Sequence, residues 1–225
     1  MADVLAWWER PRRVSVVIDN PSWVLPWGHD LVEQLCAAGD SAALVTRQEE
    51  VPEGAVAFYL GCLRITPPEV LARNRRNLVV HASALPQGRG FSPLTYQIIE
   101  GLNRIPVCLL DAVEGVDSGP VVYREWIDYG GHELIGELRQ KLGAMTVELC
   151  RRFMGEPAPP SGAPQRGEPS TYPRRRPADS ALDPGQTIAE QFDLLRTVDN
   201  DNYPAYFDLR GHRYVIRIEK MEKSS

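Results

Sequence analysis

The sequence is poor in cysteine. Its 225 residues include four, Cys36, Cys62, Cys108 and Cys150, which are far apart and lie among apolar residues. Cysteines that hold a metal or build a disulfide framework recur at short, regular spacings. Neither pattern occurs here, so we expect reduced thiols in the core and no metal centre.

An excess of positive charge is also missing. The chain has 25 Lys and Arg residues against 30 Asp and Glu, which gives a net charge of −5. A protein that binds nucleic acid along an extended surface needs a dense basic face, so we expect no nucleic-acid partner. The one basic cluster, Arg174 to Arg176, falls in a proline-rich stretch and is predicted to be solvated linker.

Long apolar runs are absent as well. The first residues, MADVLAWWERPRR, hold no apolar stretch of the length that a signal peptide or a membrane span requires. We therefore expect a cytoplasmic protein with no membrane partner. Residues 1–12 are predicted to be a short lead-in, with Trp7 and Trp8 packed on the domain or on a partner.

Apolar, β-branched runs alternate with segments of helical spacing through residues 13–154. We expect strands at 14–19, 42–46, 56–61, 77–83, 105–114 and 119–128. We expect helices at 29–38, from a capping box at Thr66 to Glu69, at 92–100 and at 131–154. Strands that alternate with helices form a mostly parallel sheet wrapped by helices. The prediction is an α/β domain, Rossmann-like and open, with helices on both faces.

The composition changes after Met154. Residues 155–178 are rich in Pro, Gly and Ser and are predicted to be a linker without a packed element. Residues 179–225 are predicted to hold a helix, opened by a capping box at Thr187 to Glu190, and a hairpin that turns at Arg210 and Gly211. The edge of such a hairpin can pair two copies into a homodimer, whereas a monomer with a covered edge fits the same pattern.

One histidine stands at the end of a buried strand. Leu78, Val79 and Val80 lead to His81, and a loop rich in Gly and Pro follows before a helix opens at Ser92 and Pro93. Open α/β sheets place their chemistry at the carboxyl ends of the strands. Asp117, in a second turn flanked by glycines, is the carboxylate best placed to orient this imidazole.

This stretch resembles the folate-dependent formyltransferases, the family that includes glycinamide ribonucleotide, methionyl-tRNA and nucleotide-sugar N-formyltransferases. HASALPQGRGFSP matches the family pattern Asn-x-His-x-Ser-x-Leu-Pro from the histidine onward, and Asp117 with Gly119 matches a later Asp-x-Gly element. GCLRI at 61–65 is similar to the family's pterin-facing loop, and residues 174–216 resemble the segment that follows the catalytic domain in nucleotide-sugar N-formyltransferases.

The resemblance implies an enzyme that transfers a formyl group from N10-formyltetrahydrofolate to the primary amine of a small molecule, above all a nucleotide-linked amino sugar. An amino acid is an alternative acceptor. His81 would act as acid and base, Asp117 would orient it, and Ser83 would bond to His81 or cap the loop. The implied folate-binding residues are Leu63, Arg64, Ile65, Leu85, Val113, Glu114 and Gly115, and the implied substrate-binding residues are Asn20, Ser22 and Trp23.

The chain departs from the family pattern at one position. The family's catalytic Asn falls two residues before the histidine, where this sequence has Val79. Residues two apart on a strand share a face, and Asn77 lies about 6.6 Å further back at roughly 3.3 Å per residue, too far unless the strand bulges. Protonated His81, a backbone N–H or a residue from another loop would then stabilise the oxyanion. A folate-binding or nucleotide-binding pseudoenzyme and a formyl-folate hydrolase are the competing hypotheses.

Overall fold

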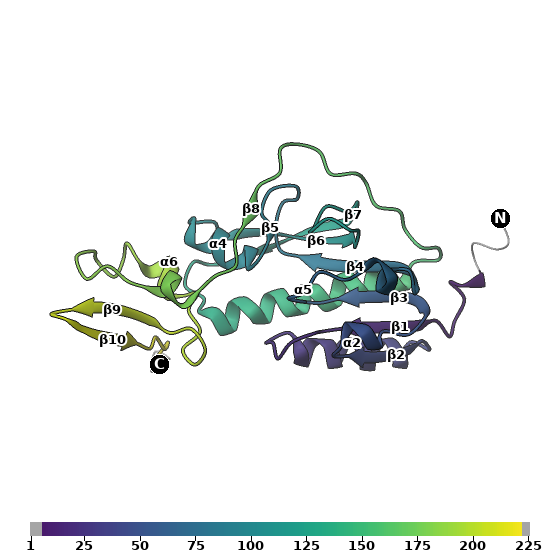
Figure 1. The fold of residues 1–225 in the computed structure, drawn as a ribbon, viewed down its shortest axis with the longest axis horizontal. Coiled ribbons are helices and arrows are strands. Elements are labelled where there is room, and N and C mark those ends of the chain that lie inside the picture. The colour runs from purple at the N-terminus through teal and green to yellow at the C-terminus, as the bar shows by residue number, and fades with distance from the viewer. Residues whose placement is uncertain (1–5, 222–225) are drawn as a thin grey trace.

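A six-stranded sheet forms the centre of the molecule (Figure 1), and the computed structural model describes residues 6–221. Its strand order is β2-β1-β3-β4-β6-β7. The first four strands pair in parallel, while β6 and β7 are antiparallel to their neighbours. The predicted mostly parallel, Rossmann-like sheet is confirmed. The strands are β1 Arg13–Val17, β2 Ser41–Val45, β3 Gly54–Tyr59, β4 Asn74–His81, β6 Arg104–Asp111 and β7 Val121–Asp128.

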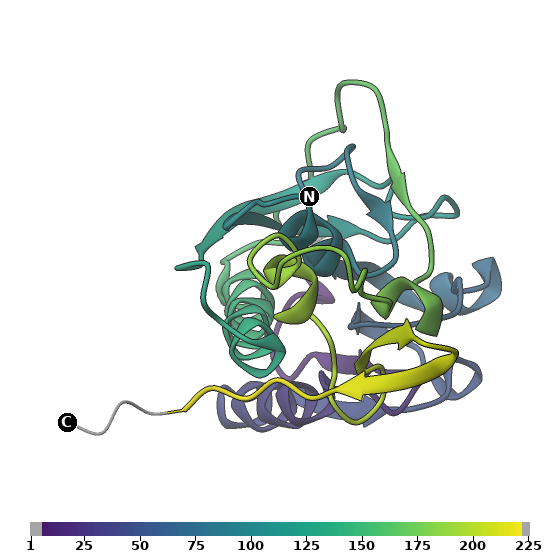
Figure 2. The same ribbon diagram turned by 90° about the vertical axis from the view of Figure 1, so that its left-hand side faces the viewer.

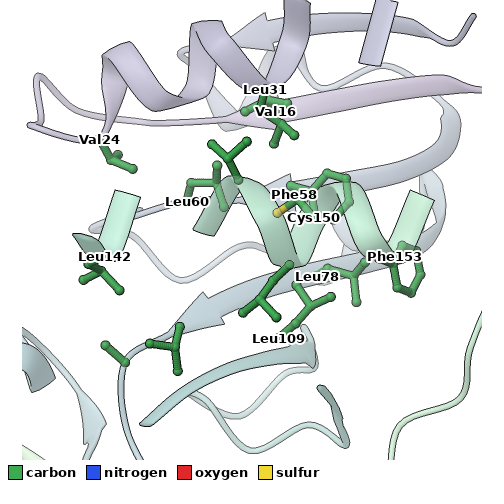
Figure 3. Packing of buried hydrophobic residues seen from close by; sticks show 14 of the residues in the cluster. Val16, Val24, Leu31, Phe58, Leu60, Leu78, Leu109, Leu142, Cys150 and Phe153 are labelled. Carbon is green, nitrogen blue, oxygen red and sulfur yellow. The ribbon is translucent and has the colours of Figure 1, made fainter. Parts of the chain in front are cut away.

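The sheet buries an apolar layer on each face. Alternate residues such as Val16, Phe58, Leu78 and Leu109 pack together against the long helices on one face (Figure 3). These helices are α2 Leu25–Ala37 and α5 Ile135–Gly155. The opposite face carries smaller clusters, covered by α3 Pro68–Leu71, the 3₁₀ turn η1 Gln48–Glu50 and the loop after β4. His81 has the residue parity of this thinly covered face.

Several helix ends differ from the sequence prediction. Helix α2 starts at Leu25 rather than residue 29. Helix α5 starts at Ile135 rather than residue 131, because the Glu133 carboxylate accepts the N–H groups of Gly130 and Gly131 and holds a turn there. Helix α4 Pro93–Ile99 begins as predicted, but Ser92 has left-handed backbone and makes no capping hydrogen bond. The N-cap of α3 is Pro67, so the capping box predicted at Thr66 does not form.

The segment predicted as an unpacked linker is anchored to the domain. Residues 156–176, the strap, leave the end of α5 and arch over β7 and β5 (Figure 1). Within the strap, β8 Thr171–Tyr172 pairs in parallel with β5 Arg89–Gly90. Ala163 forms a two-bond bridge with Val121. The prediction of no packed element is therefore wrong, because backbone pairing with partners distant in sequence orders this chain.

A small appendage follows the strap and projects from one end of the sheet domain (Figures 1 and 2). It contains the 3₁₀ turn η2 Pro177–Ser180, the four-residue helix α6 Phe192–Leu195, and the hairpin β9 Ala205–Leu209 and β10 His212–Ile216. The Thr187 to Glu190 capping box forms, but regular helix begins only at Phe192. Arg210 and Gly211 have the positive φ angles that a tight hairpin turn requires.

The N-terminal lead-in also packs on the domain. Trp8 is 5% exposed and lies edge-on to Phe153 of α5, and Arg12 is buried in an ion pair with Asp40. Residues 1–5 of the predicted lead-in lie outside the described residues. Within residues 6–221, no helix combines the length and apolar character needed to cross a membrane. The proposed division into lead-in, catalytic domain, linker and C-terminal unit stays a prediction.

Candidate active site

A cleft of about 910 Å³ crosses the carboxyl ends of the parallel strands. Its walls come from the loops after β1, β3 and β4, the β6–β7 turn, α5, the end of the strap and the appendage. His81 and Asp117 both lie in this wall. The structure therefore brings together two residues that are 36 positions apart in the sequence and were predicted to act together.

His81 is held at both ring nitrogens. Nε2 lies 2.7 Å from the carbonyl oxygen of Gly88, and Nδ1 lies 3.4 Å from Oδ2 of Asp117. A carbonyl can only accept a hydrogen bond, so Nε2 must carry a proton. Nδ1 faces the Asp117 carboxylate, so the two contacts together fix the orientation of the ring.

Asp117 is positioned by its backbone as much as by its histidine partner. Its φ is +46°, in the left-handed region, and its Oδ2 accepts the Gly90 N–H at 2.8 Å. A Cβ on Gly119 would collide with the carbonyl oxygen of Asp111, so the β6–β7 turn requires glycine at this point. The Asp-x-Gly spacing is therefore a steric requirement of the turn that presents Asp117.

The strap holds both partners of this pair. Gln165 donates from Nε2 to the carbonyls of Asp117 (2.7 Å) and Gly119 (2.8 Å), and its Oε1 accepts from Arg89. The Ser170 hydroxyl accepts the N–H of Gly88, the residue whose carbonyl faces His81. These contacts join the loop after β4, the Asp117 turn and the strap into one hydrogen-bonded unit. Sequence analysis missed Gln165 and Ser170, because nothing local marks them.

Val79 has no polar substitute on its strand. It lies opposite Tyr59 of β3 and Leu110 of β6 in unbroken register, and it lines the cleft. Asn77 donates to the carbonyl of Leu71 and accepts from the Tyr59 hydroxyl, which leaves its amide occupied by structure. Because β4 does not bulge here, Asn77 cannot replace the missing family residue.

Ser83 lies behind the site rather than in it. Its side chain is buried, and among the described residues its Oγ has no hydrogen-bond partner. The predicted bond from Ser83 to His81 is therefore not formed. A Cβ added to Gly88 would lie only 3.0 Å from the Cβ of Ser83. Ser83 therefore packs against the Gly88 loop, which supplies the carbonyl that contacts His81.

The loop at 61–65 is organised by Asp19. The fully buried carboxylate of Asp19 accepts the N–H groups of Leu63 (2.8 Å) and Arg64 (3.2 Å) and the side-chain amides of Asn20 and Gln48. Burial alone would raise the pKa of Asp19, but these hydrogen bonds outweigh it and lower the pKa. Leu63 and Ile65 are left exposed at the cleft, with Val113 and Gly115 of the β6–β7 turn in the same wall.

Two of the predicted folate-binding residues lie elsewhere. Leu85 is 2% exposed and packs with Cys108 and Leu110, so it is a core residue and not a wall of the cleft. Glu114 is exposed but is not part of the cleft lining, unlike its neighbours. Leu85 is buried because the loop after β4 folds back over the thinly covered face of the sheet.

The predicted substrate residues do line the cleft. Asn20 is tied to the Gly61 carbonyl at 2.9 Å, and Ser22 Oγ accepts the Val24 N–H at 3.4 Å. Trp23 lies under the Arg139 guanidinium, 5.9 Å from its ring centroid. Five residues that sequence analysis did not assign to the site also line the cleft: Arg174, Arg175, Arg176, Asn202 and Tyr203.

Comparison with known proteins shows which family the chain belongs to. No protein-family model matches the chain. The methionyl-tRNA formyltransferases of Streptococcus gordonii and Roseobacter denitrificans are 30% and 32% identical over 170 and 165 residues, or 73% and 72% of this chain and 53% of each relative. The chain belongs to the formyltransferase family. It spans about half the length of these curated relatives.

Solved structures of the family share the fold. A methionyl-tRNA formyltransferase from Clostridium thermocellum superposes with a TM-score of 0.76 at 19% identity, over 95% of both chains. A sugar N-formyltransferase from Shewanella gives 0.67 at 16% identity, over 94% of this chain and 99% of that one. HypX from Aquifex aeolicus, in complex with tetrahydrofolic acid, gives 0.68 at 17% identity, over 90% of this chain and 37% of that one. This fold is therefore shared by a protein named for a tRNA acceptor and by a protein named for a sugar acceptor.

Proposed function

We propose that this chain transfers a formyl group from N10-formyltetrahydrofolate to the primary amine of a small molecule, with a nucleotide-linked amino sugar as the acceptor. The observation that carries the proposal is His81, fixed between Asp117 and Gly88 in the wall of a large cleft. A paired histidine and carboxylate suit a reaction in which protons move as an acyl group changes partners.

The cleft fits a planar donor along one wall. Leu63, Ile65 and Val113 expose 41%, 68% and 43% of their surface there, which leaves apolar area for a flat ring to cover. The N–H groups of Leu63 and Arg64 are already bonded to Asp19, so backbone recognition in this loop would use carbonyl oxygens. Leu63, Arg64, Ile65, Val113 and Gly115 are accordingly our proposed folate-binding residues.

The chain's own residues would manage charge and protons. With folate bound, the amine nitrogen would form a bond to the formyl carbon and lose a proton, while the bond from that carbon to N10 breaks and N10 gains a proton. His81 would donate a hydrogen bond near the formyl oxygen, and Asp117 would hold the orientation of the imidazole. In this structure Nε2 bonds to the Gly88 carbonyl, so His81 would use this nitrogen in proton transfer only after that hydrogen bond opens.

The test is mass spectrometry of the purified protein with N10-formyltetrahydrofolate and a panel of amines. The panel holds nucleotide-linked amino sugars, free amino acids and initiator methionyl-tRNA, with H81A as the inactive variant. A formylated amino sugar that H81A does not produce would support the proposal. Formylation of the tRNA would overturn the small-molecule acceptor, and formylation of an amino acid would name the alternative acceptor.

Val79 favours a second candidate function, a family member that binds folate or nucleotide without transfer or that hydrolyses the donor. We expect V79N to raise the transfer rate about tenfold or more, because loss of one oxyanion donor costs about 10²–10³ in rate. V79T, which adds no amide, is the control. Hydrolysis of the donor without amine, or folate binding without either reaction in wild type and V79N, would select the second candidate.

Two further proposals concern the cellular location and the oligomeric state of the protein. We expect a cytoplasmic location, and the exposed edges of the β9–β10 hairpin can pair two copies into a homodimer. Light scattering of the wild type and of a variant with the hairpin shortened at Arg210 and Gly211 would test the dimer. A monomeric wild-type protein would remove it.

A further inference from the structure

The cleft has unpaired positive charge in one wall. Five cationic side chains line it: Arg64, Arg139, Arg174, Arg175 and Arg176. Arg64 pairs with Glu49 at 2.9 Å, and Arg139 pairs with Asp199 at 2.7 Å. Among the described residues, no carboxylate lies within ion-pairing distance of the guanidinium groups of Arg174, Arg175 or Arg176. Arg175 donates to the backbone carbonyl of Asp179 at 2.8 Å, whereas the guanidinium groups of Arg174 and Arg176 form no hydrogen bond among residues 6–221. Three positive charges thus line the cleft without a carboxylate to neutralise them in the described part of the chain.

The acidic residues of the cleft do not neutralise these arginines, because each is engaged elsewhere. Asp111 pairs with Arg76, Asp117 with His81, and Asp199 with Arg139. The carboxylate of the nearby Asp179 accepts the backbone N–H of Arg176 at 2.6 Å and forms no ion pair with a guanidinium; only the backbone carbonyl of Asp179 accepts from Arg175. In a chain of net charge −5, an uncompensated group of three arginines at a cleft indicates a site for an anion.

The arginines are held in place by the strap. Tyr172, two residues earlier, stacks on Tyr96 at 4.6 Å and donates to Glu100, and the Tyr96 hydroxyl donates to the Pro173 carbonyl. Arg174 and Arg175 then lie 5.8 and 5.7 Å from the rings of Phe91 and Tyr96. Stacking over rings restrains a guanidinium while leaving its N–H donors available. The site is anchored on α4 and is distinct from the apolar wall at Leu63 and Val113.

We propose that Arg174 and Arg176, with Arg175 beside them, bind the phosphate or diphosphate of the acceptor. This inference rests on the proposed function and adds which residues bind the diphosphate of the nucleotide-linked acceptor. Guanidinium forks match phosphate oxygens in pairs, and several of them suit a group with more than one negative charge. Carboxylates of a folate glutamate tail carry similar chemistry, so the experiment separates the two sources.

The first experiment measures equilibrium binding of a nucleoside 5′-diphosphate and of inorganic pyrophosphate by calorimetry, with no transfer involved. R174Q/R176Q removes two charges from exposed side chains that make no hydrogen bond of their own among the described residues. R166E is the matched control, since it changes the net charge by the same amount at an exposed strap residue outside the cleft. We expect diphosphate Kd to rise at least tenfold in R174Q/R176Q and less than twofold in R166E. No diphosphate binding by wild type, or equal loss in both variants, would overturn the site.

The second arm compares tetrahydrofolate carrying one glutamate with the form carrying five. We expect R174Q/R176Q to leave both affinities unchanged. Loss of a preference for the longer tail, with diphosphate binding intact, would assign the arginines to the donor and refute the acceptor site. Should diphosphate binding depend on the arginines while no amine is formylated, the anion site stands and the proposed transfer falls.

Discussion

Strand β4 and the strap meet at the candidate site, and they are opposites in composition. In β4, Leu78 is fully buried and the apolar pattern leads directly to His81. The strap is built of Pro, Gly, Ser and charged residues and is mostly exposed. Yet the strap bonds to the Asp117 turn through Gln165 and to the Gly88 loop through Ser170. Burial of apolar residues in β4 positions His81, whereas long-range hydrogen bonds from the strap position the Asp117 turn and the Gly88 loop.

We expect the largest effect from substitutions in the His81–Asp117 pair, which β4 helps to position. H81A should lower the rate of formyl transfer about 10³-fold, and D117N about 10²-fold, because each removes one partner of the charged pair. Steady-state kinetics measures both, and H29A, an exposed histidine of α2 outside the cleft, is the control. Equal rates in H81A and H29A would remove His81 from the mechanism.

The next change breaks the attachment of the strap. Gly90 has φ +97°, and an added Cβ would lie 2.5 Å from the Tyr172 carbonyl oxygen, so G90A should part β5 from β8. We expect a loss of about 2–3 kcal/mol in the free energy of unfolding, measured with urea. G136A in α5 is the control, since its new Cβ meets no atom within 4 Å. A stable G90A with normal activity would show that the strap is not needed to hold the site.

A smaller effect sharpens the role of the strap as a positioning element. Q165L removes two hydrogen bonds to the Asp117 turn without touching the cleft lining. We expect kcat to fall about tenfold with the acceptor KM unchanged, since roughly 1.4 kcal/mol of orientation is lost. Q87L, which breaks a hydrogen bond from the loop after β4 to the Glu168 carbonyl of the strap, is the control and should change neither kcat nor KM.

The smallest expected effect concerns the joint between α5 and the appendage. Burial would raise the pKa of Asp199, but hydrogen bonds from Arg139 and from residues 201–202 outweigh it and lower the pKa to about 2. The folded pKa lies below the ordinary value of 3.8, so this pair stabilises the protein above about pH 4 and loses its effect as the pH falls towards 2.

D199N should therefore reduce the free energy of unfolding by about 1–2 kcal/mol at pH 7 and by less near pH 3. Urea titrations at the two pH values measure the difference. D201N, which removes an exposed carboxylate paired with Arg217, is the control and should cost far less. A cost for D199N that does not change with pH would contradict the assigned ion pair.

The comparison also explains which predictions failed. The capping box at Thr66 did not form, because Pro67 is the N-cap of α3. Ser92 is the N-cap of α4 as predicted, but with left-handed backbone it makes no capping hydrogen bond. Leu85 looked like a ligand contact by resemblance, but the fold of its loop buries it against Cys108. Arg174 to Arg176 read as solvated linker because their composition says nothing about the cleft that lies beside them.

The sequence by itself determined the sheet, since short continuous apolar runs rich in β-branched residues favour strands that are buried on both faces. It also determined the place of His81 at a strand end and the glycine-rich turn of Asp117. Only the tertiary structure decided that the strap is ordered, that Asn77 does not replace Val79, and that three arginines without a carboxylate partner among the described residues line the cleft. These features depend on hydrogen bonds and charges between residues far apart in the chain, such as Gln165 and Asp117. No local pattern records such pairs, because each partner is an ordinary polar residue until the fold brings them together.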